Sequence, residues 1–302
     1  MSNSSIPFKS GFIALLGRPN VGKSTLLNAI LTRKVAIISE KPQTTRNRIR
    51  GVKNLPGAQM VFIDTPGIHK STIPMNRIMV KTAFRASKEV DLILFMTEEK
   101  GNIERKEGDR YILTSLQPSV TPVFLLINKV DIMDKERLLM MVDRYNQAFP
   151  FSETFPISAM TGDGLDQLQE AIVERLLPGP RYFPEEMHTD QPLEFWLGEL
   201  IREKVFSLTH QEIPYSTAIN VEQVEERSNN RFYIGATIYL EKESQKGIVI
   251  GKNGRMLKKI GEIARKDMEI LLGAPIYLDL WVKVQKDWRR DKAFLERLEM
   301  ER

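Results

Sequence analysis

The stretch GRPNVGKS, residues 17–24, decides the fold of the first half of this chain. It matches the pattern G-x-x-x-x-G-K-[ST], the apolar run FIALL precedes it at residues 12–16, and a helix-like segment follows at Thr25 to Leu31. Glycines between a strand and a helix let backbone amides wrap a phosphate, and the helix N-terminus adds partial positive charge. The sequence therefore predicts a phosphate-binding loop, in which Lys23 reaches the β- and γ-phosphates and the Ser24 hydroxyl ligates Mg²⁺.

Further apolar runs recur along the first half of the chain: MVFID at 60–64, DLILF at 91–95 and VFLLIN at 123–128. Continuous rather than alternating hydrophobicity is typical of parallel strands that are covered on both faces. Helix-like segments lie between these runs, and another follows at Leu165 to Leu177. This order predicts a doubly wound α/β sheet, with ligands bound by the loops at the carboxyl ends of its strands.

The proline-rich segment PGPRYFPEE follows Leu177 and cannot continue a helix. We therefore expect a nucleotide-binding domain over residues 7–178, a linker over 179–192 and a second domain over 193–302. In the second domain the pattern predicts a helix at 193–208, strands at 216–224 and 231–241, a glycine-bounded basic turn opening a helix to about residue 272, a strand at 276–284 and a charged C-terminal helix. That order is a small α+β domain.

The tetrapeptide NKVD, Asn128 to Asp131, selects the base of the bound nucleotide. Guanine presents two adjacent donors that one carboxylate can accept, whereas adenine would leave a buried carboxylate facing an acceptor. Asp131 is therefore the expected specificity residue, with Asn128 bracing the loop and the Lys129 stem covering the ring. Two further motifs end strands in the same order: DTPG at 64–67, for magnesium and the γ-phosphate, and SAM at 158–160, for the guanine carbonyl oxygen.

Composition limits the remaining chemistry. The 302 residues contain no cysteine, which excludes disulfides, thiolate metal sites and a catalytic thiol. No apolar run reaches the ~20 residues that span a bilayer, and His69, His188 and His210 show no metal-site spacing. The net charge is +5, but the charge is segregated: the charged residues of 185–226 are mostly acidic, while those of 41–53 and 246–266 are mostly basic. Such segregation is typical of an anionic partner, although solvated helix faces give the same pattern.

GRPNVGKS, PQTTR, DTPG, NKVD and SAM in this order resemble the motifs of translation-factor-class GTPases, close to the Era and tRNA-modification groups. In that class a threonine between the first and third motifs closes over Mg²⁺ and the γ-phosphate. Thr44 and Thr45 both qualify, and we favour Thr45, so that the resemblance implies Ser24, Thr45 and Asp64 as metal ligands. The expected nucleotide-binding residues are Gly17, Arg18, Pro19, Asn20, Val21, Gly22, Lys23, Ser24, Thr25, Asp64, Thr65, Pro66, Gly67, Asn128, Lys129, Asp131, Ser158, Ala159 and Met160.

Hydrolysis of GTP needs a group that orients the attacking water, and the residue after DTPG is Ile68, whose side chain cannot do so. In relatives an asparagine at the position of Asn20 helps to hold K⁺, which stabilises transition-state charge; alternatively, Asn20 only favours the loop backbone. Arg18 and Arg46 are further electrostatic candidates. We expect slow turnover, on the order of 10⁻⁴ to 10⁻² s⁻¹. The expected catalytic residues are Lys23, Thr45, Asn20 and Gly67.

The basic turn of the second domain is G-x-x-G, Gly251 to Gly254, with the apolar IVI before it and a basic helix after it. A lone G-x-x-G is an ordinary structural turn in most proteins. Here its setting and the α-β-β-α-α-β order resemble a type II KH domain, which clamps about four unpaired nucleotides. The expected RNA-binding residues are Ile250, Gly251, Lys252, Asn253, Gly254, Arg255, Lys258 and Lys259. Ile248, Ile250 and the strand around Ile276 are expected to line an apolar groove, although most of these apolar residues fit the core equally well.

A GTPase domain followed by one KH domain resembles the Era family over nearly the whole chain. The resemblance implies a cytoplasmic GTP-hydrolysing switch protein that binds small-subunit ribosomal RNA near its 3′ end, assists 30S assembly and contacts the membrane peripherally; we also expect a monomer. Alternatives are a nucleotide-gated RNA-binding scaffold, a tRNA-modification GTPase, whose flanking domains differ, and a metabolic kinase, against which NKVD argues. The bases of the Lys41 to Arg50 switch segment either meet RNA or neutralise the nucleotide phosphates.

Overall fold

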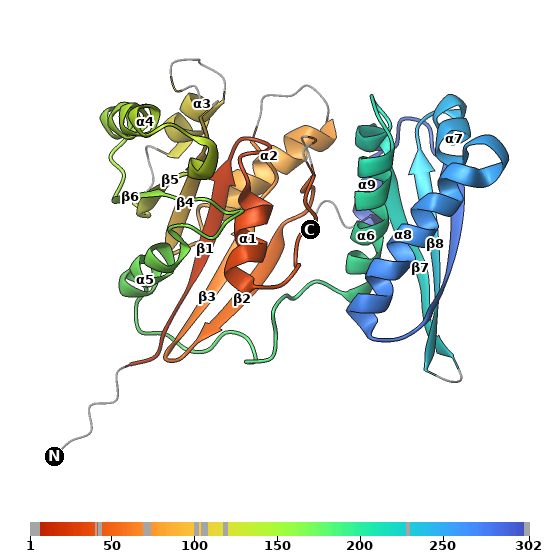
Figure 1. Cartoon of the computed structure of the whole chain (residues 1–302), viewed down its shortest axis with the longest axis horizontal. Helices are drawn as coiled ribbons and strands as arrows, with labels where there is room; N and C mark the ends of the chain where they lie inside the picture. Colours follow the sequence, from red (N-terminus) through yellow and green to blue (C-terminus); the bar gives the residue numbers. More distant parts are fainter. Residues whose placement is uncertain are drawn as a thin grey trace. The chain divides into compact units, whose positions relative to one another are not determined.

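The computed structural model describes residues 7–39, 41, 44–68, 74–99, 103, 108–116, 120–227 and 230–298. The chain divides into two compact units between Asp190 and Gln191 (Figure 1). No helix in the described ranges combines the length and hydrophobicity that a membrane span requires. His69, residues 42 and 43 of the switch segment and the last four residues of the chain lie outside the described residues.

The first unit is built on a twisted sheet in which the strand order is β2-β3-β1-β4-β5-β6. Every neighbouring pair is parallel except β2 and β3, which are antiparallel. β3, β4 and β5 are buried along their whole length, as continuous apolar runs predict. The strands are β1 (Lys9–Gly17), β2 (Ile49–Leu55), β3 (Ala58–Asp64), β4 (Leu92–Thr97), β5 (Val123–Ile127) and β6 (Glu153–Pro156).

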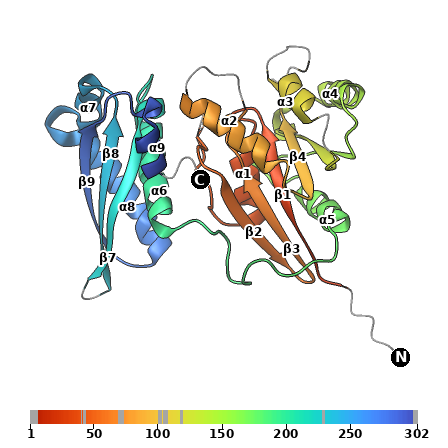
Figure 2. The ribbon, with the colours of Figure 1, turned by 180° about the vertical axis from the view of Figure 1, so that it is seen from behind.

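Helices cover both faces of this sheet, which confirms the doubly wound α/β fold. α1 and α5 lie on one face, and α2, α3 and α4 lie on the other (Figures 1 and 2). Beneath the second group, Ile93, Phe95 and Leu125 form a core with Ile112 and Tyr145. The helices are α1 (Lys23–Leu31), α2 (Pro74–Ala86), α3 (Asp109–Leu116), α4 (Lys135–Ala148) and α5 (Leu165–Arg175).

The edge strand β2 carries no signal of the kind that identified the other strands. Its sequence, IRGVKNL, mixes buried and half-buried positions, because β2 pairs with one neighbour only. Its register sets Ile49 opposite Asp64. The chain that leaves the switch segment therefore enters the sheet beside the DTPG motif.

Residues 179–190, which the sequence assigns to a linker, pack along the β2 and β3 strands of the first unit. The buried Gln59 side chain accepts from the amides of Tyr182 and Phe183 at 2.8 and 3.0 Å. The Val52 amide donates to the His188 carbonyl at 2.9 Å, and Arg50 forms an ion pair with Asp190. These bonds hold the segment against the sheet edge up to the boundary between the units.

The second unit has the element order α-β-β-α-α-β that the sequence predicts. Its sheet has the order β7-β8-β9, with β7 antiparallel and β9 parallel to β8. Ile201, Ile238, Val249 and Ile260 belong to the core between the sheet and its helices. The elements are α6 (Leu193–Leu208), β7 (Ala218–Arg227), β8 (Arg231–Leu240), α7 (Glu243–Ile250), α8 (Arg255–Leu272), β9 (Ile276–Val284) and α9 (Lys292–Arg297).

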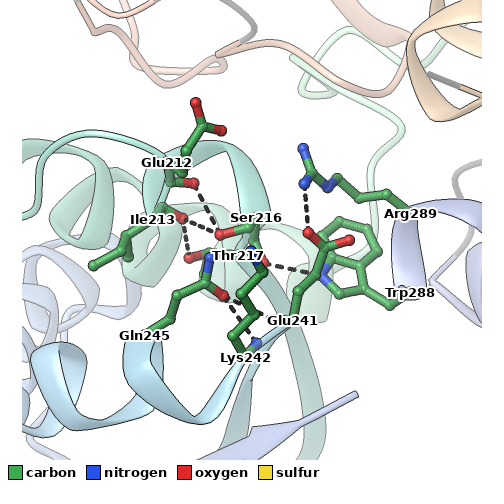
Figure 3. Close-up of polar contacts among 9 residues, drawn as sticks. All are labelled: Glu212, Ile213, Ser216, Thr217, Glu241, Lys242, Gln245, Trp288 and Arg289. Carbon is green, nitrogen blue, oxygen red and sulfur yellow. Dashed lines mark hydrogen bonds and ion pairs between the residues drawn. The ribbon is translucent and has the colours of Figure 1, made fainter. Parts of the chain in front are cut away.

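The C-terminal segment caps the sheet of this unit. Trp288 is fully buried, and its Nε1 donates to the Ser216 carbonyl at 2.9 Å, while Arg289 forms an ion pair with Glu241 (Figure 3). Phe294 of α9 meets Tyr239 edge to face, with ring centroids 5.0 Å apart. Where the sequence predicts a charged C-terminal helix, the described residues form a 3₁₀ turn (Trp288–Arg290) followed by α9.

Candidate functional site

The predicted phosphate loop connects β1 to α1 with the backbone geometry that its glycines allow. Gly22 has φ 105°, and a Cβ there would lie 2.3 Å from the side-chain Nδ2 of Asn128. At Gly17 a Cβ would lie 2.4 Å from the Met96 carbonyl oxygen. Asn20 also has positive φ, 66°, which asparagine tolerates better than most residues. Side chains at these glycines would clash with the neighbouring strand ends, so the backbone path of the loop requires glycine at both positions.

Lys23, the first residue of α1, has a buried ammonium that contacts the loop itself. Its Nζ donates to the carbonyl oxygens of Arg18 at 3.0 Å and Gly17 at 3.3 Å. Burial lowers the pKa of Lys23 to about 8; the Asp64 carboxylate raises this pKa and the Arg18 charge lowers it further. An anion in the loop would relieve this cost, because it would pair with the buried charge.

The three predicted metal ligands converge at the start of α1. The Ser24 hydroxyl donates to Asp64 Oδ2 at 2.6 Å and lies 2.9 Å from Thr45 Oγ1, which is itself 3.3 Å from Asp64 Oδ2. Asp64 is fully buried, and its Oδ1 has no hydrogen-bond partner among the described residues. Burial raises the pKa of Asp64, against the opposing effects of Lys23 and of the hydrogen bonds from Ser24 and Thr45. Two hydroxyls around a buried, incompletely satisfied carboxylate fit a hard divalent cation such as Mg²⁺.

The two candidate threonines of the switch segment have different partners. Thr44 Oγ1 donates to the Lys41 carbonyl at 2.7 Å, within the switch segment itself. Thr45 is buried and directs its hydroxyl to Ser24 and Asp64. The geometry therefore brings Thr45, and not Thr44, to the hydrogen-bond cluster of Ser24 and Asp64.

Asn128 ties three motifs together. Its Nδ2 donates to the Val21 carbonyl of the phosphate loop at 2.7 Å, and its Oδ1 accepts from the Ala159 amide at 2.9 Å. The side chain is buried, so both bonds are shielded from water. Lys129 Nζ reaches the Asn20 carbonyl at 3.1 Å and pairs with Glu98. The bracing function that the sequence assigns to Asn128 is visible in these bonds.

A cavity of about 630 Å³ lies over the phosphate loop, which is a suitable volume for a nucleotide. Glu98 and the segment Ile37 to Ser39 border it without belonging to any motif, which is why the sequence missed them. Asp131 lies in an exposed 3₁₀ turn (Val130–Ile132) and is not among the residues that line the cavity, so its carboxylate is open to solvent. The residues singled out from the sequence that line the cavity are Arg18, Pro19, Asn20, Gly22, Lys23, Ser24, Thr25, Thr44, Thr45, Gly67, Lys129 and Met160.

The segment after Asp64 approaches the phosphate loop closely. Thr65 Oγ1 donates to the Leu15 carbonyl at 2.6 Å, and a Cβ at Gly67 would lie 2.7 Å from Pro19 Cα. Ile68 is fully buried in the core with Leu16, and its amide donates to the Gly17 carbonyl at 3.1 Å. The residue at the usual water-orienting position is thus a packing residue here.

In the second unit the G-x-x-G segment is a sharply turned backbone between α7 and α8. Gly251, Asn253 and Gly254 all have positive φ, at 72°, 53° and 75°. A Cβ at Gly251 would lie 2.8 Å from Met256 Cβ, whereas one at Gly254 would meet nothing within 4 Å. The turn is therefore fixed on its inner side and open on its outer side, where another backbone can approach.

A groove of about 390 Å³ runs beside this turn. Its apolar wall comes from Leu257, Leu278 and Leu280, and its polar rim includes Lys258 and Arg265. The sequence expected Ile248, Ile250 and the strand around Ile276 to line the groove or to belong to the core. The strand β9 lines it through Leu278 and Leu280. IVI forms the last turn of α7, and Ile276 is buried in the core, so only the later part of β9 faces the groove.

The exposed basic residues that the sequence singled out surround the turn and the first turns of α8. Lys252, Arg255, Lys258 and Lys259 are all exposed. Trp281 is 41% exposed on β9, in contrast to the buried Trp196 and Trp288.

The fold and these two sites define a P-loop GTPase followed by a KH domain. A family model described as 50S ribosome-binding GTPase matches residues 12–129, and a KH domain model matches residues 212–289. Since relatives named GTPase Era share about half of its residues over nearly its whole length, the chain belongs to the Era family of GTPases and hydrolyses GTP.

Both sequences and solved structures carry this assignment. GTPase Era of Geobacter metallireducens is 51% identical over 293 residues, 97% of this chain and 98% of the relative. GTPase Era of Syntrophus aciditrophicus is 51% identical over 292 residues, 96% of this chain and 95% of the relative. A variant of Aquifex aeolicus Era bound to GDP and AlF4⁻ is 40% identical, has a TM-score of 0.92 and covers 97% of this chain and 99% of its own. Era in complex with MgGDPNP and nucleotides 1506–1542 of 16S ribosomal RNA has a TM-score of 0.93 at 40% identity, with the same coverage.

Proposed function

We propose that this protein is a GTP-operated RNA-binding switch that binds small-subunit ribosomal RNA near its 3′ end and assists 30S subunit assembly. The RNA is that of the similar Era complex, in which nucleotides 1506–1542 of 16S ribosomal RNA are bound together with MgGDPNP. The observation that supports RNA binding by this chain is the Gly251 to Gly254 turn. The turn is open on its outer side, contains the exposed Lys252 and is followed by the exposed Arg255.

The nucleotide is held by the loop of residues 17–24 and by the strand-end motifs. Backbone amides of the loop and the Lys23 ammonium bind the phosphates, and Asn128 fixes the loop against the Ala159 segment. Asp131 accepts the two donors of guanine, and the Lys129 stem covers the ring. Thr65, Pro66, Ser158 and Met160 complete the expected contact set.

Ser24, Thr45 and Asp64 would hold the Mg²⁺ that accompanies the nucleotide. When bound, Mg²⁺ neutralises charge on the phosphate oxygens during transfer. Because Thr45 belongs to the 41–50 segment and Asp64 opens the DTPG loop, their shared hydrogen-bond cluster joins the two expected switches. Loss of the γ-phosphate would release both segments, because both are held at the Ser24–Thr45–Asp64 cluster.

Catalysis on this chain cannot use Ile68, because its side chain is apolar and fully buried. Asn20 is exposed at the cavity with its backbone already in the left-handed region. We assign to it a K⁺ ion that stabilises transition-state charge. The φ of 66° at Asn20 equally supports a role in shaping the loop backbone. An experiment separates this role from K⁺ binding.

Replacing K⁺ with Na⁺ is expected to slow GTP hydrolysis at least about tenfold, because an electrostatic contact to the transition state is lost. Asn20→Gly keeps the positive φ and removes the side chain, so the variant should hydrolyse GTP slowly at the same rate in either salt. Single-turnover rates in KCl and NaCl measure both effects. A wild-type rate that does not depend on the cation would leave Asn20 as a loop-backbone residue only.

The RNA assignment is tested by direct binding with the protein loaded with a GTP analogue and Mg²⁺. An RNA with the 3′-terminal sequence of the small-subunit ribosomal RNA should bind at least about tenfold more tightly than an RNA of the same length with shuffled bases, since unpaired bases are read individually. Fluorescence anisotropy at fixed salt gives both dissociation constants. Equal affinities would contradict the RNA target.

Peripheral membrane contact, a cytoplasmic location and a monomeric state stay predictions.

A further inference from the structure

Asp109, the first residue of α3, is a fully buried carboxylate that belongs to none of the nucleotide motifs. Its Oδ1 accepts from Arg18 Nε at 2.9 Å. Its Oδ2 accepts from Thr97 Oγ1 at 2.9 Å and from Tyr145 Oη at 2.6 Å. One carboxylate thus connects the phosphate loop with the end of β4 and with α4.

This arrangement satisfies the buried charge. A buried carboxylate is costly unless it is paired and hydrogen-bonded, and Asp109 has one cation and two hydroxyl donors. Burial, followed by the Asp109 charge, raises the pKa of Tyr145, so its phenol stays protonated and donates at neutral pH. The partner that Asp109 holds through charge is Arg18, whose side chain is 24% exposed.

Arg18 occupies the second position of the phosphate loop, where its backbone and side chain face different partners. Its carbonyl accepts from Lys23 Nζ at 3.0 Å, and the next residue, Pro19, lies against the Gly67 backbone. On the side-chain side, a Cβ at Gly108 would lie 3.0 Å from Arg18 Cδ, so the chain that leads to Asp109 passes close to the arginine stem. A displacement of Arg18 would therefore move the carbonyl that meets Lys23.

We propose that Asp109 is a positioning residue for GTP hydrolysis, which acts through Arg18 to fix the phosphate loop against the strand β4. This inference rests on the proposed role of the loop in binding the nucleotide phosphates. Asp109 itself is fully buried and does not line the cavity over the phosphate loop; the Arg18–Asp109 ion pair sets the position of the backbone from which Lys23 and the loop amides act. Hydrolysis depends more steeply on such placement than binding does, because the transition state tolerates less misalignment.

Asp109→Asn tests the proposal, since it keeps the side-chain shape and removes the charge that Arg18 meets. We expect the kcat for GTP to fall about tenfold, the loss that removing one charge-assisted hydrogen bond predicts, while the Kd for GDP changes less than about twofold. Tyr145→Phe is the matched control: it removes another donor to the same carboxylate, lowers the melting temperature and leaves kcat unchanged. Equal kcat losses in the two variants would mean a general packing role and would overturn the proposal.

A double-mutant cycle measures the coupling in kcat between Arg18 and Asp109, which a merely structural role of Asp109 would not produce. In an Arg18→Gln background, Asp109→Asn should cause no further loss of kcat, because the contact through which Asp109 acts is already gone. Additive losses of kcat would reject the proposal.

If Asp109→Asn does not stay folded, Arg18→Lys tests the same contact. We expect a several-fold lower kcat at an unchanged melting temperature, and an unchanged kcat would contradict the proposal. Absence of GTP turnover in the wild type would instead reject the proposed function itself.

Discussion

Asp131→Asn is expected to lower the affinity for GTP on the order of a thousandfold and to create affinity for xanthosine triphosphate. The carboxylate accepts two donors from guanine, whereas an asparagine amide presents one donor and one acceptor to the same edge. Xanthine carries an oxygen in place of the guanine amino group, so it matches the altered pair. Titration calorimetry with both nucleotides measures the exchange of specificity.

The structure supplies a matched control for this variant. Asp134 lies three residues further on, at the start of α4, and its side chain makes no capping hydrogen bond. Asp134→Asn should therefore bind GTP as the wild type does. Wild-type GTP affinity in Asp131→Asn, with no gain for the xanthine nucleotide, would show that NKVD does not read the base.

Lys252→Asp combined with Asn253→Asp is expected to weaken RNA binding at least about a hundredfold at low salt, with GTP hydrolysis retained. Both side chains are exposed on the G-x-x-G turn, and the change sets two negative charges where a nucleic-acid backbone approaches. Asn253 has φ 53°, which aspartate also tolerates, so the turn itself should persist. Anisotropy with labelled RNA and a phosphate-release assay measure the two activities.

Lys286→Asp is the control for this double variant. It is followed by Asp287, which has φ 54°, so the substitution forms two adjacent acids on comparable backbone geometry away from the turn. Its RNA affinity should stay within about threefold of wild type. Loss of GTP hydrolysis in the G-x-x-G variant would show that the two activities are not divided between the two units.

The parallel strands and the phosphate loop could be predicted because each leaves a pattern in adjacent residues. β3, β4 and β5 are buried on both faces and therefore read as continuous apolar runs. β2 was missed since an edge strand with the sequence IRGVKNL satisfies a single neighbour and shows no such run.

Within the site, motif residues could be predicted and their partners could not. Thr45 was separated from Thr44 only by its hydroxyl contacts to Ser24 and Asp64, each of which joins segments about twenty residues apart. Asp109 gave no signal at all, because a single buried acid is defined by what surrounds it in space. Such contacts depend on tertiary packing and leave no spacing in the chain.

The central claim is that the bound nucleotide controls RNA binding. The most direct measurement is the affinity of the full chain for the 3′-terminal RNA, at one salt concentration, with a GTP analogue, with GDP and with no nucleotide. We predict at least about fivefold tighter binding with the analogue than with GDP, in line with the similar Era complex that holds both MgGDPNP and RNA. Equal affinities in all three states would contradict the account, because a ligand shifts an equilibrium only by binding its two states differently.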